Sequence, residues 1–119
     1  MRLIIAGSRD MSISHDELFE IIDKLDILYK ITEIVSGGAL GIDSDGEEFA
    51  GRYGIKLTRF LADWNKYGGL AGPRRNREMA RYADALLVIH NGSRGSLHMK
   101  KCMDTMKKPV YEVIRESNE

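Results

Sequence analysis

Two glycine-rich turns are the first places in this sequence where chemistry can be expected. Gly37 and Gly38 follow the apolar and β-branched run 31–36, and a helical pattern begins after them near Ile42. Glycine lets the backbone approach a ligand closely, and the first amides of the following helix have no intrahelical partner, so such a turn can bind an anion. Because a strand-to-helix turn also needs glycine for steric reasons alone, both interpretations stay open for this turn.

The second turn lies between the apolar run 85–89 and a helical pattern that contains Met99. Its backbone amides and hydroxyl groups predict a second site for a phosphate. Neither turn is followed by the Gly-Lys-Ser/Thr of a Walker loop, and neither has the glycine spacing of a dinucleotide fold. The residues of this turn that we expect to contact a ligand are Gly92, Ser93, Gly95 and Ser96.

A small polar turn, Gly7, Ser8 and Arg9, follows the first apolar run, residues 3–6. A guanidinium and a hydroxyl beside a backbone amide can bind a phosphate. An ordinary surface turn has the same composition. The triplet therefore becomes a candidate ligand site only if the fold brings it to the other two turns.

Three arginines follow Pro73, a residue that fits the first turn of a helix. A cation in that turn is disfavoured by about 0.3–1 kcal/mol because the helix dipole is positive there, so the cluster indicates a bound anion. We expect Arg75 and Asn76 to contact the ligand and the other arginines to be solvated, with Glu78 pairing locally. The three arginines are Arg74, Arg75 and Arg77.

Asp43 and Trp64 are candidates for contacting the ribose or base of a nucleotide. Asp43 is among several acids at the start of the second predicted helix, where each gains about 0.3–1 kcal/mol from the dipole. A carboxylate beside the first turn would repel a phosphate but accept hydrogen bonds from ribose hydroxyls or a base. Trp64 lies in the polar segment 62–72, which we predict to be a loop, and its ring either anchors that loop or stacks on a base.

The histidines and the single cysteine do not form a metal-ligand pattern. His15, His90 and His98 have no ligand spacing with Cys102. Cys102 lies on the apolar stripe of the last predicted helix, so we assign it to the core. We therefore expect no metal and no cofactor.

Apolar runs that alternate with helical patterns predict the elements that position these residues. Such alternation is typical of an α/β fold, a Rossmann-like, doubly wound and mainly parallel five-stranded sheet with helices on both faces. Ligands of such sheets bind at the carboxyl ends of the strands, and all the candidate loops leave strands at that edge. The predicted strands are 3–6, 31–36, 56–61, 85–89 and 109–113, and the predicted helices follow Ser14, Ile42, Pro73 and Ser96.

The composition sets the remaining expectations. A chain of 119 residues is the size of one domain, residues 1–119. Its 18 Lys and Arg balance its 18 Asp and Glu, which makes nucleic acid an unlikely partner on overall charge and leaves a local basic patch open. No apolar run approaches the roughly 20 residues of a membrane span, and the first residues have no signal-peptide layout, so we expect a cytoplasmic protein without a membrane partner.

The motifs taken together resemble the YspA, or YpsA-related, branch of the SLOG superfamily. The resemblance covers nearly the whole chain and implies a Rossmann-like fold that binds a nucleotide or a nucleotide-derived ligand. The superfamily includes the Lonely Guy phosphoribohydrolases and the DNA-processing protein A, which binds single strands. The matching segments are Gly7-Ser8-Arg9, Ser36-Gly37-Gly38-Ala39-x-Gly41-x-Asp43, Ala62-Asp63-Trp64-x-x-Tyr67-Gly68, Gly72-Pro73-x-Arg75-Asn76-x-x-Met79 and Gly92-x-x-Gly95-Ser96.

Similarity to the Lonely Guy enzymes implies a catalytic role for Arg75, but the chain lacks the catalytic glutamate of those enzymes. Their catalytic arginine falls on Arg75, and their phosphate-binding threonine falls on Ser96. Their catalytic glutamate falls on Met99, which cannot transfer a proton. Hydrolysis by this chain would therefore need another carboxylate, for which Asp43 and Glu78 are the candidates.

Three functions follow as expectations. The first is binding of a nucleotide-like small molecule, a phosphate or ribose phosphate, at the C-terminal edge of the sheet. The second is an N-glycosidase acting on nucleoside 5′-monophosphates, and the third is binding of single-stranded nucleic acid. Whether copies of the chain associate into a homo-oligomer is open.

Overall fold

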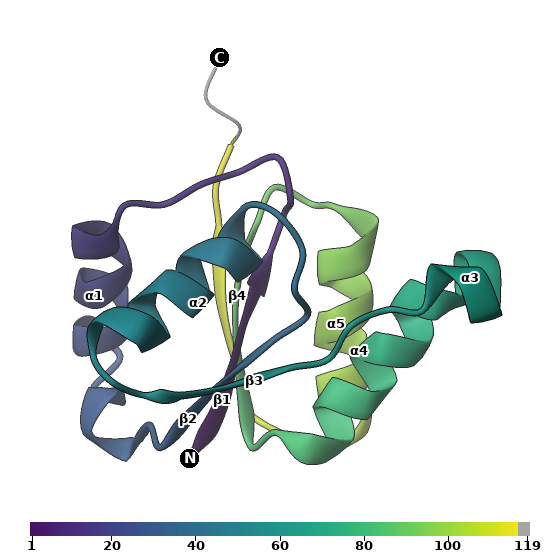
Figure 1. Ribbon diagram of the computed structural model, residues 1–119. Coiled ribbons are helices and arrows are strands. Elements are labelled where there is room, and N and C mark those ends of the chain that lie inside the picture. The colour runs from purple at the N-terminus through teal and green to yellow at the C-terminus, as the bar shows by residue number, and fades with distance from the viewer. Residues whose placement is uncertain (117–119) are drawn as a thin grey trace.

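The computed structural model describes residues 1–116 and contains a five-stranded sheet (Figure 1). The strand order is β3-β2-β1-β4-β5, and all four neighbouring pairs are parallel. This confirms the Rossmann-like α/β fold expected from the sequence. The strands are β1 (Arg2–Gly7), β2 (Glu33–Ser36), β3 (Lys56–Arg59), β4 (Ala85–His90) and β5 (Val110–Ile114).

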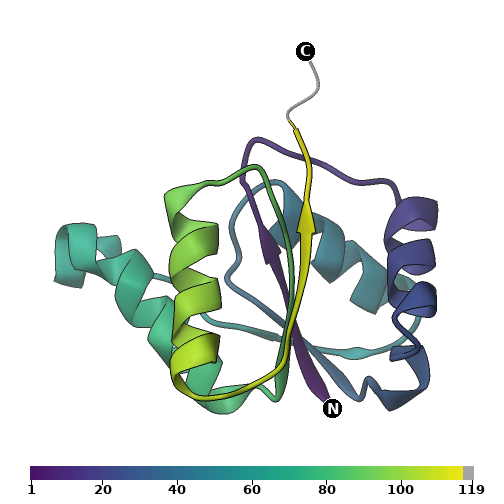
Figure 2. The ribbon, with the colours of Figure 1, turned by 180° about the vertical axis from the view of Figure 1, so that it is seen from behind.

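Helices cover both faces of the sheet. Figures 1 and 2 show α1 and α2 on one side of the strands and α4 and α5 on the other. Two short 3-10 turns, Leu28–Lys30 and Gly68–Leu70, connect longer elements. The helices are α1 (His15–Lys24), α2 (Ile42–Arg52), α3 (Trp64–Tyr67), α4 (Ala71–Tyr82) and α5 (Arg94–Thr105).

Alternate side chains of β1 enter two separate hydrophobic clusters. Leu3 and Ile5 belong to the cluster beneath α1 and α2, whereas Ile4 and Ala6 belong to the cluster beneath α4 and α5. A strand buried on both faces reads as a continuous apolar run, which is why β1 was recognisable in the sequence. Every residue of β4 is buried as well.

The first helix begins where its capping residue predicts. Ser14 has an extended backbone, and its Oγ accepts a hydrogen bond from the Glu17 amide at 3.2 Å. This bond satisfies one of the amides that a helix start leaves without a partner. Leu18 and Ile22 then point into the core from the buried face of α1.

The segment 62–72 is not the loop that the sequence predicted. It contains α3 and the turn Gly68–Leu70, and α4 begins at Ala71 rather than at Pro73. Asp63 caps α3, since its Oδ1 accepts from the Lys66 amide at 3.1 Å. A four-residue helix is too short to show a 3.6-residue period. With α4 starting earlier, Arg75 lies beyond its first turn, so the helix dipole disfavours the arginine less than the sequence argument assumed.

The strand order reverses between β1 and β4. From β1 the chain runs outward through β2 to β3, and after α4 it returns to β4 and continues to β5. At such a switch point the loops leaving the two central strands diverge and a crevice forms at the carboxyl edge. The loops after β1 and β4 carry Ser8 and the second glycine turn, and they lie at the upper edge in Figure 1.

Candidate functional site

Arg75 and Asn76 connect the two glycine turns. Arg75 Nη1 donates to the carbonyl oxygen of Gly37 at 2.6 Å, and Arg75 Nε donates to Asn76 Oδ1 at 3.1 Å. Asn76 Nδ2 in turn donates to the carbonyl oxygen of Gly95 at 3.3 Å. A continuous hydrogen-bonded path therefore runs from the loop after β2, through α4, to the first turn of α5.

Gly37 makes room for two charged side chains. A Cβ at this position would lie 2.9 Å from Arg75 Nη1 and 3.0 Å from Asp43 Oδ2. Any larger residue would have to displace one of these groups. The glycine thus lets a carboxylate and a guanidinium approach the same short stretch of backbone.

Asp43 is a buried carboxylate held by two backbone amides. It is 5% exposed, and its Oδ1 and Oδ2 accept from the amides of Gly7 and Ala39, each at 3.3 Å. Burial raises the pKa of Asp43, and these amides together with Arg75 oppose the rise. Burial also lowers the pKa of Arg75, and Asp43 opposes that change.

The amides of the first glycine turn are already engaged by the protein itself. The Gly38 amide donates to Ser36 Oγ at 3.0 Å, and the Ala39 amide donates to Asp43. A phosphate placed on these amides would have to displace both oxygens and would lie beside the Asp43 carboxyl. The two glycine turns, which look alike in the sequence, therefore differ in whether their backbone amides are free to bind a phosphate.

Ser8 joins the loop after β1 to the loop after β4. It is 1% exposed, and its Oγ lies 2.8 Å from Asn91 Oδ1 and 3.0 Å from Ser93 Oγ while accepting from the Asn91 amide at 3.1 Å. Ser93 Oγ also donates to Ser96 Oγ at 2.7 Å. These hydroxyls hold the second turn in place, so their first role is structural.

The start of α5 is open to an anion. Ser93, the residue before α5, makes no side-chain capping bond to the first amides of the helix, because its hydroxyl bonds to other hydroxyls instead. Gly92 has φ +93°, a conformation that favours glycine, and a Cβ on Gly95 would meet nothing within 4 Å. Uncapped helix amides with open space around them can bind a phosphate.

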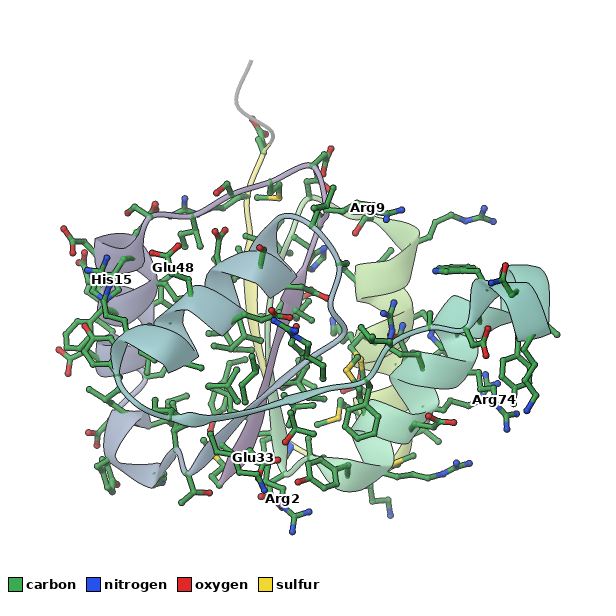
Figure 3. All side chains as sticks on the ribbon, in the orientation of Figure 1. Arg2, Arg9, His15, Glu33, Glu48 and Arg74 are labelled. Carbon is green, nitrogen blue, oxygen red and sulfur yellow. The ribbon has the colours of Figure 1, made fainter. Side chains whose placement is uncertain are left out.

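Arg9 adds a second positive charge near this opening. It lies close enough to Arg75 to contribute to lowering the pKa of that guanidinium. Figure 3 shows Arg9 at the upper edge of the sheet, beside the end of α5 that begins at Arg94. An anion bound beside both guanidinium groups would offset their repulsion, so the pair favours an anionic ligand.

Two residues from the sequence-based set lie outside this cluster of contacts. Glu78 is exposed, and its Oε1 lies 3.7 Å from Arg74 Nε, an arginine that points away from the sheet in Figure 3. Trp64 is 57% exposed and packs beside Gly72 at the start of α4. Met99, at the position of the Lonely Guy glutamate, is buried in the core.

Two histidines support the site in ways that the sequence reasoning missed. His98 Nδ1 lies 3.1 Å from Asn76 Nδ2, and burial lowers the pKa of His98, with Arg77 and Lys101 adding to the effect. His90 Nδ1 accepts from the Gly92 amide at 2.9 Å. The sequence signal for His90 was a polar residue ending an apolar strand, directly before a glycine turn.

Two further observations concern the described part of the chain. Across residues 1–116, no three His, Cys, Asp or Glu residues gather in a way that could hold a metal ion. Over the same range, no helix is both long and apolar enough to cross a membrane.

A solved structure shares the fold of this chain. DNA processing protein A from Streptococcus pneumoniae superposes with a TM-score of 0.71 at 18% sequence identity. The match covers 94% of this chain and 49% of the other, so the chain spans about half the length of that protein. No curated protein sequence matches.

A family comparison identifies the chain. The sequence model described as the YspA, cpYpsA-related SLOG family matches residues 1–67. The matched part contains the first glycine turn and Asp43, whereas Arg75 and the second turn lie beyond it. Because the match covers more than half of the chain, the protein belongs to the YspA, cpYpsA-related SLOG family.

Proposed function

We propose that the chain binds a nucleotide or a nucleotide-derived ligand at the carboxyl edge of the sheet, with a phosphate at the start of α5. The observation that carries this proposal is the path from Gly37 through Arg75 and Asn76 to Gly95. It joins a buried carboxylate and an uncapped helix start at the switch point of the sheet, where ligands of this architecture bind.

The two turns have different tasks in this proposal. The phosphate accepts hydrogen bonds from the amides of Arg94, Gly95 and Ser96, and the guanidinium groups of Arg75 and Arg9 complement its charge. The first turn is closed by Ser36 and Asp43, so it faces the uncharged part of the ligand. Asp43 accepts hydrogen bonds from ribose hydroxyls or from the base.

A calorimetric titration with ribose 5-phosphate and with a panel of nucleoside monophosphates tests the proposal. Loss of a charged hydrogen-bond donor costs about 1.5–3 kcal/mol, so Arg75→Ala should weaken binding at least about tenfold. Arg74→Ala is the matched control, because it removes the neighbouring arginine of the same helix, whose guanidinium pairs with Glu78 at the surface. Equal losses in both variants, or no binding by the unmodified protein, would refute the assignment.

A second candidate function is hydrolysis of the N-glycosidic bond, and the burial of Asp43 favours it. Burial raises the pKa of the Asp43 carboxyl, a shift common in carboxyls that act as general acids, whereas Met99 has no proton to exchange. In this reaction the oxygen of a water bonds to C1′ of the ribose, the bond to the base breaks, and the base leaves with a proton. Release of free base from a nucleoside monophosphate, abolished by Asp43→Asn, would establish the activity.

A third candidate is binding of single-stranded nucleic acid, and the distribution of charge favours it. Within residues 1–116, Arg77, Arg81 and Lys101 form no ion pair. Burial lowers the pKa of His98, and the charges of Arg77 on α4 and Lys101 on α5 lower it further. The zero net charge of the chain does not describe this surface, so it is no evidence against the binding of nucleic acid.

A further inference from the structure

His90 ends β4 two residues before the glycine of the second turn, and it is 3% exposed. Its Nδ1 accepts from the Gly92 amide at 2.9 Å, and its Nε2 lies 2.8 Å from Glu112 Oε2. A backbone amide can only donate, so Nδ1 carries no proton and the ring proton lies on Nε2, from which it is donated to Glu112. The contacts therefore require one neutral tautomer.

This bond sets the course of the chain into α5. It spans two residues, as in an Asx turn, and it holds Gly92 at φ +93°. Ser93 follows immediately, and its hydroxyl contacts Ser8 and Ser96. The amides that we assign to the phosphate come directly after this anchored residue.

We propose that His90 is a positioning residue for the second glycine turn, and that a proton on its Nδ1 releases Gly92 and weakens ligand binding at the start of α5. The part that concerns the ligand rests on the proposed function. A proton on Nδ1 would face the amide proton of Gly92, so the hydrogen bond would be lost. Glu112 would retain its hydrogen bond to Nε2.

Other charged groups near the His90 ring contact Glu112, the backbone of His90 or the side chain of Asn91. Lys100 of α5 donates to Glu112 Oε1 at 3.0 Å, so it offsets part of the charge that faces the ring from β5. The Arg115 amide donates to the carbonyl oxygen of His90, while its guanidinium pairs with Glu17 of α1. In the loop after β1, Asp10 accepts from the side chain of Asn91, the residue that follows His90.

Nitrogen-15 NMR of the full chain tests the positioning role without any ligand. In a titration from about pH 8 to about pH 5, the Gly92 amide signal should move together with the signals of the His90 ring nitrogens. His90→Asn supplies an oxygen that can accept from the same amide and does not titrate, so its Gly92 signal should stay constant. A Gly92 signal in the unmodified protein that ignores protonation of the ring would overturn the proposal.

Sulfate, which keeps its charge across this range, tests the link to binding. Loss of one hydrogen bond should weaken sulfate binding about three- to tenfold at the acid end for the unmodified protein, and hardly at all for His90→Asn. Equal pH dependence in the unmodified protein and His90→Asn would contradict the proposal. If sulfate never binds but the Gly92 signal follows the ring, the positioning role stands and the proposed function fails.

Discussion

Asp43 places an ionisable group where ionisation is unfavourable, which gives the folded protein a pH dependence. Its pKa is raised in the folded state, so the folded chain holds this proton at pH values where the unfolded chain has released it. Asp43 therefore lowers the free energy of unfolding as the pH rises from its ordinary value, 3.8, through the raised value. Below that window the group contributes no pH dependence.

We predict that Asp43→Asn removes this component of the pH dependence. Urea unfolding of the variant and of the unmodified protein, compared at a series of pH values from about 3.9 upward, gives the difference in free energy of unfolding. The difference should change in favour of the variant as the pH rises. Glu48→Gln, which alters an exposed carboxylate of the same helix, is the control. A constant difference for Asp43→Asn would contradict the burial argument.

At the scale of elements, α2 packs on β1 through a glycine, and this close approach brings Asp43 to the edge of the sheet. A Cβ on Gly46 would lie 2.8 Å from Ile5 Cβ, whereas one on Gly51 of the same helix would meet nothing within 4 Å. Gly46 is buried and Gly51 is exposed. Substitutions at Gly46 therefore report on packing, whereas substitutions at Gly51 report on intrinsic helix preference.

We predict opposite effects for alanine at these two glycines. Gly46→Ala should destabilise the protein by about 1–3 kcal/mol, because overpacking forces α2 away from β1. Gly51→Ala should stabilise it by about 0.5–1 kcal/mol, because alanine restricts the unfolded chain and has a higher helix preference than glycine. Urea unfolding measures both changes, and a stabilising Gly46→Ala would show that α2 does not pack on β1 as closely as described.

At this scale, the sequence predicted the elements that have a clear apolar pattern. The continuous runs of β1 and β4 predicted buried parallel strands, and the parallel order placed the loops with Gly37, Arg9 and Gly95 at one edge. The short helix α3 left no period to detect. The sequence could not predict that the amides of the first turn are occupied, or that His90 bonds to Gly92. These contacts depend on which acceptor atoms the folded chain brings close to each amide, and residue spacing does not determine that.

At the scale of the whole molecule, the neutral chain has an uneven surface. Arg77, Arg81 and Lys101 lie on α4 and α5 without ion pairs within residues 1–116. Arg81 follows Arg77 by one helical turn, so both lie on one side of α4. The opposite helices, α1 and α2, carry acids that include Asp16, Asp23 and Glu48.

We predict that any binding of a single-stranded oligonucleotide depends on this basic surface and on salt. Each phosphate contact contributes a slope of about −0.7 in log affinity against log salt concentration, so three contacts give about −2. Replacing Arg77, Arg81 and Lys101 with glutamine should remove most of that slope in a fluorescence anisotropy titration. Replacing Lys24, Arg52 and Lys56 is the control, because these cations pair with acids elsewhere. Equal slopes for both triple variants would exclude this surface.

The central claim is that separate loops bind one ligand whose phosphate lies at the start of α5. Amide NMR during a titration with adenosine 5′-monophosphate and with ribose 5-phosphate tests it most directly. We predict that the largest shifts occur at the amides of residues 92–96 and the Nε signal of Arg75, with smaller shifts around Asp43 from the ribose. Shifts confined to the α1 and α2 surface, or an unchanged second turn at saturating ligand, would contradict the account.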